Sequence, residues 1–266
     1  MDSQEIQRFN RAAWDREVAR GNPWTVPVTD VEVEAAKAGD WSVVLTPAKP
    51  VPRRWFGLPE VGPARFEGTR ILCLASGGGQ QGPLLAAAGA RVLVFDASAA
   101  QLARDRERAA RHQLTLETQQ GFMERLDGLD DASFDLVFHP VSNTFAPELE
   151  PVWREAFRVL RPGGVLLAGF MNPDLFLFDE AREEHAKGPE DFVVVHKLPH
   201  VEYPEDGPIE HSHTLQAQLG DQLAAGFLMS DFFEDGQPGR LISDYMPMAF
   251  ATRSLRPHER DLEPAS

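Results

Sequence analysis

Cysteine is nearly absent from this sequence. Of its 266 residues, Cys73 is the single cysteine. One thiol excludes an internal disulfide, a zinc site built from cysteines and a redox-active pair. Cys73 falls within an apolar run, so we expect a small buried residue without reactive chemistry.

Long hydrophobic runs and an excess of basic charge are also lacking. No apolar stretch approaches membrane-spanning length, and the N-terminal residues 1–5 are polar and acidic, unlike a signal peptide. We therefore expect a cytoplasmic protein with no membrane partner. The chain has 26 Lys and Arg residues against 41 Asp and Glu residues, a formal net charge of −15. This balance disfavours a nucleic-acid partner, because phosphate backbones attract clustered basic side chains.

The sequence does contain a predicted strand, glycine turn and helix in succession. Residues 71–74 are a short apolar run without helical periodicity, typical of a buried parallel strand. Gly77, Gly79 and Gly82 follow with the spacing G-x-G-x-x-G, and residues 84–88 favour a helix that ends at Gly89. This geometry brings backbone N–H groups and a helix N-terminus close to a ligand. No Gly-Lys-Ser/Thr follows the glycines, which excludes a P-loop.

The acidic residue Asp96 ends the next predicted strand, residues 91–95. A carboxylate at such a strand end, about 20 residues past the glycines, is where the hydroxyls of a ribose are held. The motif therefore predicts a nucleotide-like ligand. Two ligand classes fit it and stay open at this point: a dinucleotide and the adenosyl group of S-adenosylmethionine.

The N-terminal part, residues 1–68, is expected to be a helical extension packed on the core. Helices are predicted at residues 4–20 and 30–38. Four of the five tryptophans lie here: Trp14, Trp24, Trp41 and Trp55. Most of them are expected to form a satellite core, while one or two are candidates to line an acceptor pocket beneath a lid.

The remainder of the chain divides into four parts. Residues 69–172 alternate strand and helix, with strands at 71–74, 91–95, 114–118, 134–138 and 165–170 and helices at 84–88, 98–112 and 147–160. The charged run at 104–108 is predicted to be a solvated helix face. Residues 173–210 are expected to be an insertion covering the substrate, with a helix at 175–187 and a strand at 192–196. Residues 211–255 are expected to add a helix at 214–225 and strands at 227–233 and 245–252, before a polar tail at 256–266.

Three motifs in this order resemble the class I S-adenosylmethionine-dependent methyltransferases. They are Ile71-Leu72-Cys73-Leu74-Ala75-Ser76-Gly77-Gly78-Gly79 with Asp96 after it, then Phe134-Asp135-Leu136-Val137, then Val159-Leu160-Arg161-Pro162-Gly163-Gly164. The resemblance covers about residues 69–172 and looks like that of a bacterial branch. It implies an α/β fold, a Rossmann-like doubly wound sheet of the seven-stranded methyltransferase type, mostly parallel with a terminal antiparallel hairpin. It also implies S-adenosylmethionine as cofactor and S-adenosylhomocysteine as product.

The resemblance assigns eleven positions to the cofactor: Ala75, Ser76, Gly77, Gly78, Gly79, Asp96, Ala97, Gln101, Phe122, Met123 and His139. Residues 75–79 would wrap the methionine part, and Asp96 would bind both ribose hydroxyls. Phe122 and Met123 would border the adenine, and His139 would lie near the sulfonium. Cys73 and Phe122 depart from the family, because each replaces an acidic residue that it often has.

Methyl transfer requires an aligned acceptor, exclusion of water and, for a hydroxyl or ammonium acceptor, removal of a proton. His139 directly follows a predicted strand and is a candidate base, or its ring bonds to the main chain and shapes the turn. Asn143 is a candidate to orient the acceptor, and His213 a candidate to face the crevice. His211 and His213 lack a third ligand at a metal-site spacing, so no metal site is assigned.

The resulting hypothesis is a methyltransferase acting on the oxygen or nitrogen of a small-molecule acceptor, as a monomer or homodimer, with no nucleic-acid or membrane partner. An NAD(P)-dependent oxidoreductase is one alternative, although neither Tyr203 nor Tyr245 has the lysine four residues on that many reductases use. A non-catalytic protein that binds an adenosyl ligand is the other.

Overall fold

A seven-stranded sheet organises the described residues, 1–179 and 185–258, of this computed structural model. The strands are β1 (Arg70–Leu74), β2 (Arg91–Asp96), β3 (Leu116–Gln120), β4 (Phe134–His139), β5 (Leu160–Met171), β8 (Leu228–Asp235) and β9 (Ala249–Leu255). Their spatial order is β3-β2-β1-β4-β5-β9-β8. β1 to β5 pair in parallel, whereas β9 runs antiparallel to both β5 and β8. The predicted fold class, with its terminal antiparallel hairpin, is confirmed.

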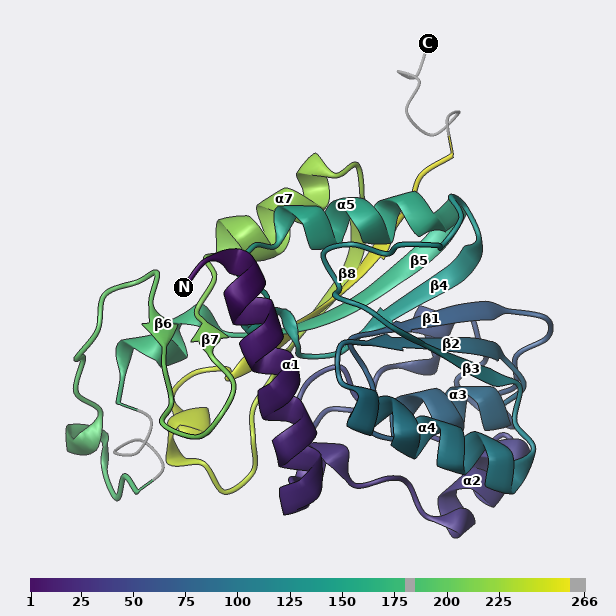
Figure 1. Ribbon diagram of the computed structural model, residues 1–266, viewed down its shortest axis with the longest axis horizontal. Coiled ribbons are helices and arrows are strands. Elements are labelled where there is room, and N and C mark those ends of the chain that lie inside the picture. Colours follow the sequence, from purple (N-terminus) through teal and green to yellow (C-terminus); the bar gives the residue numbers. More distant parts are fainter. Residues whose placement is uncertain (180–184, 259–266) are drawn as a thin grey trace.

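Helices cover both faces of this sheet (Figure 1). On one side lie α2 (Asp30–Lys37), α3 (Gln81–Ala87) and α4 (Ala99–His112), and on the other α5 (Glu150–Val159) and α7 (Asp221–Ala224). β1 shows why two layers are needed: Ile71 and Cys73 join one buried cluster, Leu72 and Leu74 the other. Successive side chains of a strand point to opposite faces, so a continuous apolar run requires cover on both.

The N-terminal extension packs along the sheet through residues 41–66. Trp41 and Trp55 are buried, and the Trp55 indole donates to Asp231 Oδ2 at 2.7 Å. Residues 46–49 are held by Asp235, whose carboxylate accepts from Thr46 Oγ1 and two backbone N–H groups. The Leu45 carbonyl passes so close to β5 that a Cβ on Gly169 would lie 2.1 Å from it. Glycine at this position lets the extension cross the sheet.

The first helix, α1 (Ser3–Arg20), takes a separate course. It crosses the front of the molecule between α4 and a small ribbon formed by β6 (Val201–Glu202) and β7 (Glu210–His211) (Figure 1). Short helical turns lie at Pro23–Thr25, Arg53–Phe56, Asn143–Phe145, Pro173–Leu177, Pro189–Asp191 and Leu241–Asp244, and a π-helical turn at Gln216–Gly220 precedes α7. In the part of the chain described, no helix combines the length and apolarity needed to cross a membrane.

Several predicted elements differ from the structure. The helix predicted at 175–187 is a short turn that ends at Leu177, and residues 180–184 lie outside the described part. The strand predicted at 192–196 is wrong: Val194 makes one isolated bridge, to Phe178, and Phe178 packs against Phe192. The N–H groups of Val195 and His196 both donate to the Leu177 carbonyl, so these hydrogen bonds and aromatic packing hold the segment without a neighbouring strand. Some elements begin later than predicted. β3 begins two residues later, α5 three residues later and β9 four residues later.

Candidate active site

A cavity of about 950 Å³ lies at the carboxyl ends of the parallel strands. Residues at or just after the ends of β1 to β5 line it: Ala75, Asp96, Gly121, Pro140 and Met171. In open α/β sheets this edge is where ligands bind, because the connecting loops diverge there. Of the predicted site residues, those that line the cavity are Ala75, Ser76, Gly77, Asp96, Ala97, Gln101, Phe122 and Met123.

Backbone N–H groups hold the carboxylate of Asp96 beside the glycine loop. Its Oδ2 accepts from the Gly77 N–H at 2.9 Å and its Oδ1 from the Ser98 N–H at 2.8 Å. Burial raises the pKa of the Asp96 carboxyl, and these two hydrogen bonds act against that shift. The side chain is therefore fixed in position next to the cavity before any ligand arrives.

The second half of the glycine loop faces away from the cavity. Gly78 has φ +111°, and a Cβ there would lie 2.7 Å from Gln101 Oε1 and 2.9 Å from the Trp24 carbonyl oxygen. The Gly79 carbonyl accepts from the Val28 N–H at 2.9 Å. The expectation that Gly78 and Gly79 wrap a ligand is thus corrected, because the N-terminal extension and α4 enclose them.

Asp105 of α4 lies beneath this loop with no exposed surface. Its Oδ2 accepts from the Gly78 N–H at 3.0 Å, while its Oδ1 has no hydrogen-bond partner among the described residues. Burial raises the pKa of this carboxyl to about 8. The prediction of a solvated face at 104–108 is wrong at this position. Gln101, Asp105 and Ala109 are all buried, and their spacing of four places them on one face of the helix.

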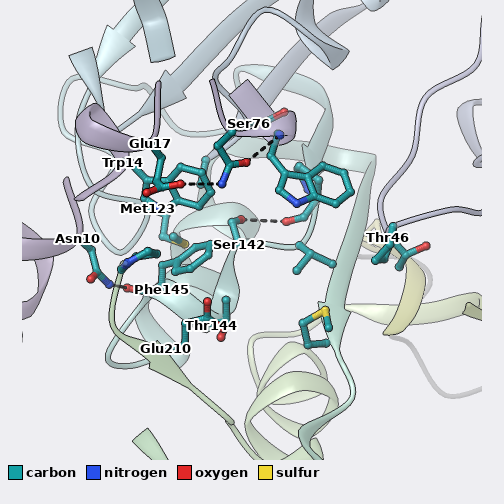
Figure 2. Close-up of a pocket in the computed structure, with 18 of the residues that line it drawn as sticks. Asn10, Trp14, Glu17, Thr46, Ser76, Met123, Ser142, Thr144, Phe145 and Glu210 are labelled. Atoms are coloured by element: carbon teal, nitrogen blue, oxygen red, sulfur yellow. Dashed lines mark hydrogen bonds between the residues drawn. The ribbon is translucent and has the colours of Figure 1, made fainter. Parts of the chain in front are cut away.

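Side chains from α1 form a wall of the cavity. Of these, only Trp14 was named from the sequence, among the tryptophans that are candidates to line a pocket. Asn10, Trp14 and Glu17 line it, and the Trp14 ring meets Phe145 edge to face with centroids 5.0 Å apart. The Asn10 amide donates to the Phe145 carbonyl at 2.9 Å, which ties α1 to the loop after β4 (Figure 2). Trp24 also lines the cavity and is half exposed. The four N-terminal tryptophans therefore divide into two core residues and two cavity residues.

His139 is completely buried and does not line the cavity. Its Nδ1 lies 2.9 Å from the Leu74 carbonyl oxygen and its Nε2 2.6 Å from Asn143 Oδ1. Asn143 Nδ2 in turn donates to Gln218 Oε1 at 2.7 Å. Burial lowers the pKa of His139. Both ring nitrogens face protein atoms, so the geometry contradicts the predicted roles of His139 as a base and of Asn143 as an acceptor ligand.

His213 is also turned away from the cavity. Its Nε2 lies 2.8 Å from the Ala146 carbonyl oxygen, and burial lowers the pKa of this ring to about 4. His211 Nδ1 lies 3.3 Å from the Thr144 carbonyl oxygen. Both rings pack on the loop after β4, and neither lines the cavity. The predicted catalytic role of His213 is corrected in the same way.

Replacing His139 with alanine is expected to lower the free energy of unfolding by about 3 kcal/mol, because it leaves a cavity and removes the partner of the Leu74 carbonyl and the Asn143 amide. Urea denaturation of the variant measures this loss. The affinity of the folded variant for S-adenosylhomocysteine should stay within about threefold of the original, since a buried ring that contacts no ligand adds little to ΔG of binding. Unchanged stability would contradict the structural role.

One group of cavity residues was missed altogether. His196, His200 and Glu202 lie within the insertion after β5, and all three line the cavity. One signal could have found them: His196 and His200 have the H-x3-H spacing of zinc-ligand pairs, which the sequence-based prediction did not use.

Comparisons with known proteins agree with the fold. A family profile described as "Methyltransferase domain" matches residues 72–168. The chain is 43% identical over 260 residues to the uncharacterized methyltransferase YbaJ of Bacillus subtilis, covering 93% of this chain and 97% of that protein. An S-adenosylmethionine-dependent methyltransferase from Mesorhizobium loti shares the fold, with a TM-score of 0.60 and 23% identity over 77% of this chain and 95% of that one.

A second crystal structure covers more of the chain, including the N-terminal extension. It is the 1,6-didemethyltoxoflavin-N1-methyltransferase of Burkholderia thailandensis with bound 1,6-didemethyltoxoflavin and S-adenosylhomocysteine. The TM-score is 0.58 at 14% identity, over 97% of this chain and 92% of that one. This similarity concerns the fold. The identity of 43% to YbaJ extends across nearly all of both chains, and it shows that this protein belongs to the class I S-adenosylmethionine-dependent methyltransferases.

Proposed function

We propose that this enzyme methylates an oxygen or nitrogen atom of a small-molecule acceptor. The observation that carries the proposal is the size of the cavity. Its volume of about 950 Å³ lies at the upper end of the range of roughly 300–1,000 Å³ for small-molecule sites. A cavity of this size has room for a second small molecule beside the cofactor.

The glycine motif fits either a dinucleotide or the adenosyl group of S-adenosylmethionine. Membership of the methyltransferase family decides for S-adenosylmethionine, which is the methyl donor. Bound S-adenosylmethionine supplies a methyl group on a sulfonium sulfur. The residues present fit it: Asp96 offers a fixed carboxylate for the ribose, and Phe122 and Met123 offer apolar surface for the adenine. Ser76 and Gly77 line the cavity next to Asp96 and are proposed to contact the methionine part.

The two departures from the family pattern have different consequences. Cys73 is fully buried, and burial raises the pKa of its thiol, so this side chain contacts no ligand. Phe122 lines the cavity, and so does Glu124 two residues later, whose carboxyl pKa is raised by burial. We propose that Phe122 packs on the adenine ring and that Glu124 is the acidic group on that side.

The acceptor end is proposed to lie under the insertion after β5. Apolar side chains line the cavity there: Met171, Leu175, Phe176, Phe178 and Met248. Such a wall suits a flat or apolar acceptor and excludes water from the transfer step. The net charge of −15 adds to the argument against a nucleic acid.

The class of acceptor is tested with S-adenosylmethionine that carries a deuterated methyl group. The enzyme is incubated with a bacterial extract separated into small molecules, nucleic acids and proteins. We expect a compound with the mass gain of one labelled methyl group in the small-molecule fraction alone. The Asp96→Ala variant is the control that should transfer no label. Label confined to the nucleic-acid or protein fraction would overturn the proposal.

A further inference from the structure

Three side chains that can bind a metal ion lie together in the wall of the cavity. Ring nitrogens of His196 and His200 and a carboxylate oxygen of Glu202 all lie within 4.8 Å of one another. His200 Nε2 lies 3.1 Å from Glu202 Oε2, and the two imidazole rings stack with centroids 3.9 Å apart. Each residue is partly buried. Across residues 1–179 and 185–258 no second cluster of three such groups is found.

The local backbone around β6 positions two of these three side chains, His200 and Glu202. His200 and Glu202 are two residues apart where the chain enters the extended strand β6, so their side chains project to the same side. Ser212, just after β7, fixes His200 from the neighbouring strand: the His200 N–H donates to Ser212 Oγ at 2.8 Å, and the Ser212 N–H donates to the His200 carbonyl at 2.9 Å. Ligands on a tied backbone need little reordering to bind an ion.

The cluster lies away from the glycine loop. Glu202 is directly opposite Glu210 in the β6–β7 ribbon, and both line the cavity. Figure 2 shows Glu210 and Ser76 on opposite sides of the cavity. The metal-binding groups therefore lie across the cavity from the glycine loop, on the side from which an acceptor would face the cofactor (Figure 2).

We propose that His196, His200 and Glu202 bind a divalent transition-metal ion, of which Zn²⁺ is the type example. Two imidazoles and one carboxylate form the donor set of catalytic zinc sites, which keep a coordination position open. Imidazole ligands favour zinc and its first-row neighbours over Mg²⁺ and Ca²⁺, which prefer oxygen ligands. The inference rests on the proposed function, because the open position takes the hydroxyl oxygen of the small-molecule acceptor.

A metal ion at this position would promote the loss of the acceptor's proton, which the predicted bases cannot do. His139 and His213 face away from the cavity, and an alcohol or phenol is a poor nucleophile before it loses its proton. Coordination to Zn²⁺ lowers the pKa of a bound oxygen acid, and the proton leaves to bulk water. The oxygen then forms a bond to the methyl carbon while the carbon–sulfur bond breaks. The electron pair of that bond stays on sulfur, which becomes a neutral thioether.

The same residues allow a different mechanism in which Glu202 orients His200 as a general base without any metal. Metal binding separates the two directly. We predict that untagged, chelator-treated protein binds one equivalent of Zn²⁺ in calorimetry. Co²⁺ in its place should give visible absorption bands typical of a low-coordinate site with nitrogen and oxygen ligands.

Variants locate the ion. His200→Ala and Glu202→Gln should each weaken Zn²⁺ binding by at least the roughly 10–100-fold that the loss of an outer-shell partner costs. Glu205→Gln is the matched control, since Glu205 is exposed, lies three residues further along and does not line the cavity. It should bind Zn²⁺ like the original protein. Affinity for S-adenosylhomocysteine, measured on every variant, reports whether each is folded.

The outcomes are distinct. Protein that binds S-adenosylhomocysteine but no Zn²⁺ or Co²⁺ overturns the metal site and leaves the methyltransferase proposal intact. Zn²⁺ binding that both variants retain at full affinity places the ion elsewhere and also overturns it. Zn²⁺ binding lost in both variants, with cofactor affinity kept, supports the site. Deuterated methyl found only in macromolecules contradicts the small-molecule acceptor, whatever the metal result.

Discussion

Replacing Asp96 with alanine is expected to weaken S-adenosylhomocysteine binding by roughly 100- to 10,000-fold. The proposed ribose site gives the carboxylate two hydroxyl donors, and each hydrogen bond to a charged group contributes about 1.5–3 kcal/mol. The same carboxylate accepts from the backbone N–H groups of Gly77 and Ser98, so the variant also loses the brace of the loop. Isothermal titration calorimetry measures the affinity, and thermal unfolding checks that the chain remains folded.

The control for this variant is Asp15→Asn. The Asp15 carboxylate accepts from the Ser98 hydroxyl at 2.6 Å and from the Ala100 N–H at 3.1 Å. Asp15 is therefore a second acid that bonds the N-terminus of α4, next to Asp96. It does not line the cavity. We expect its loss to change cofactor affinity by no more than a few-fold. An Asp96→Ala protein that still binds S-adenosylhomocysteine with the original affinity would refute the ribose assignment.

Replacing Asp105 with asparagine is expected to change how stability depends on pH. The pKa of this carboxyl is about 8 in the folded protein and near its ordinary value of 3.8 in the unfolded chain, so the folded state holds one more proton between these two pH values. Its contribution to stability is fully present below the unfolded pKa and is lost as the pH rises through the folded pKa. The free energy of unfolding should therefore fall by about 1.4 kcal/mol per pH unit from this group.

The Asp105→Asn variant has no such proton to lose. Urea denaturation at pH 5, 6 and 7 should show a slope that is less negative than that of the original protein by this amount. Asp96 and Glu124 also have raised pKa values, but they are present in both proteins and cancel in the difference. Asp127→Asn, at an exposed acid, is the control and should leave the slope unchanged. Equal slopes in the original and Asp105→Asn proteins would contradict a buried, protonated Asp105.

Asp105 also lies near Cys73, the residue that replaces an acid often present in the family. The family often has an acidic residue at the position of Cys73, late in the first strand. Here a second carboxyl group besides Asp96 bonds the glycine loop, that of Asp105 from α4. Burial is the main cause of the raised pKa of the Cys73 thiol, and Asp105 adds to it. Because the Gly78 N–H already has this acceptor, the loop is held in shape by the protein itself.

The parts of the site that the sequence revealed are those built from neighbouring residues. The apolar run of β1, the glycines after it and Asp96 at the end of β2 are local patterns, and together they indicate a ligand crevice at one edge of the sheet. Backbone geometry of this kind depends on residues within a few positions of each other. The same holds for the order of strands and helices between residues 69 and 172, from which the fold class followed.

Whether the histidine side chains reach the cavity depends on contacts between segments that are distant in the sequence. His139 and Asn143 are four residues apart, yet each has a distant partner. The Leu74 carbonyl lies 65 residues before His139, and Gln218 lies 75 residues beyond Asn143. The Asp105 side chain looked solvated because its neighbours in sequence are charged, and it is buried because the glycine loop packs on its face of α4. Burial is a property of the packed chain, so a charge pattern along one helix does not decide it.

By itself, then, the sequence determined the α/β sheet, the glycine loop and the acid that follows β2, because local backbone preferences and strand periodicity specify them. The tertiary structure decided which polar groups meet the ligand. It closed His139 and His213 into the protein, brought Trp14 of α1 over the cavity, and placed His196, His200 and Glu202 within 4.8 Å of one another. A site assembled from an extension, a sheet edge and an insertion exists only when long-range packing has joined them, and no local pattern records that packing.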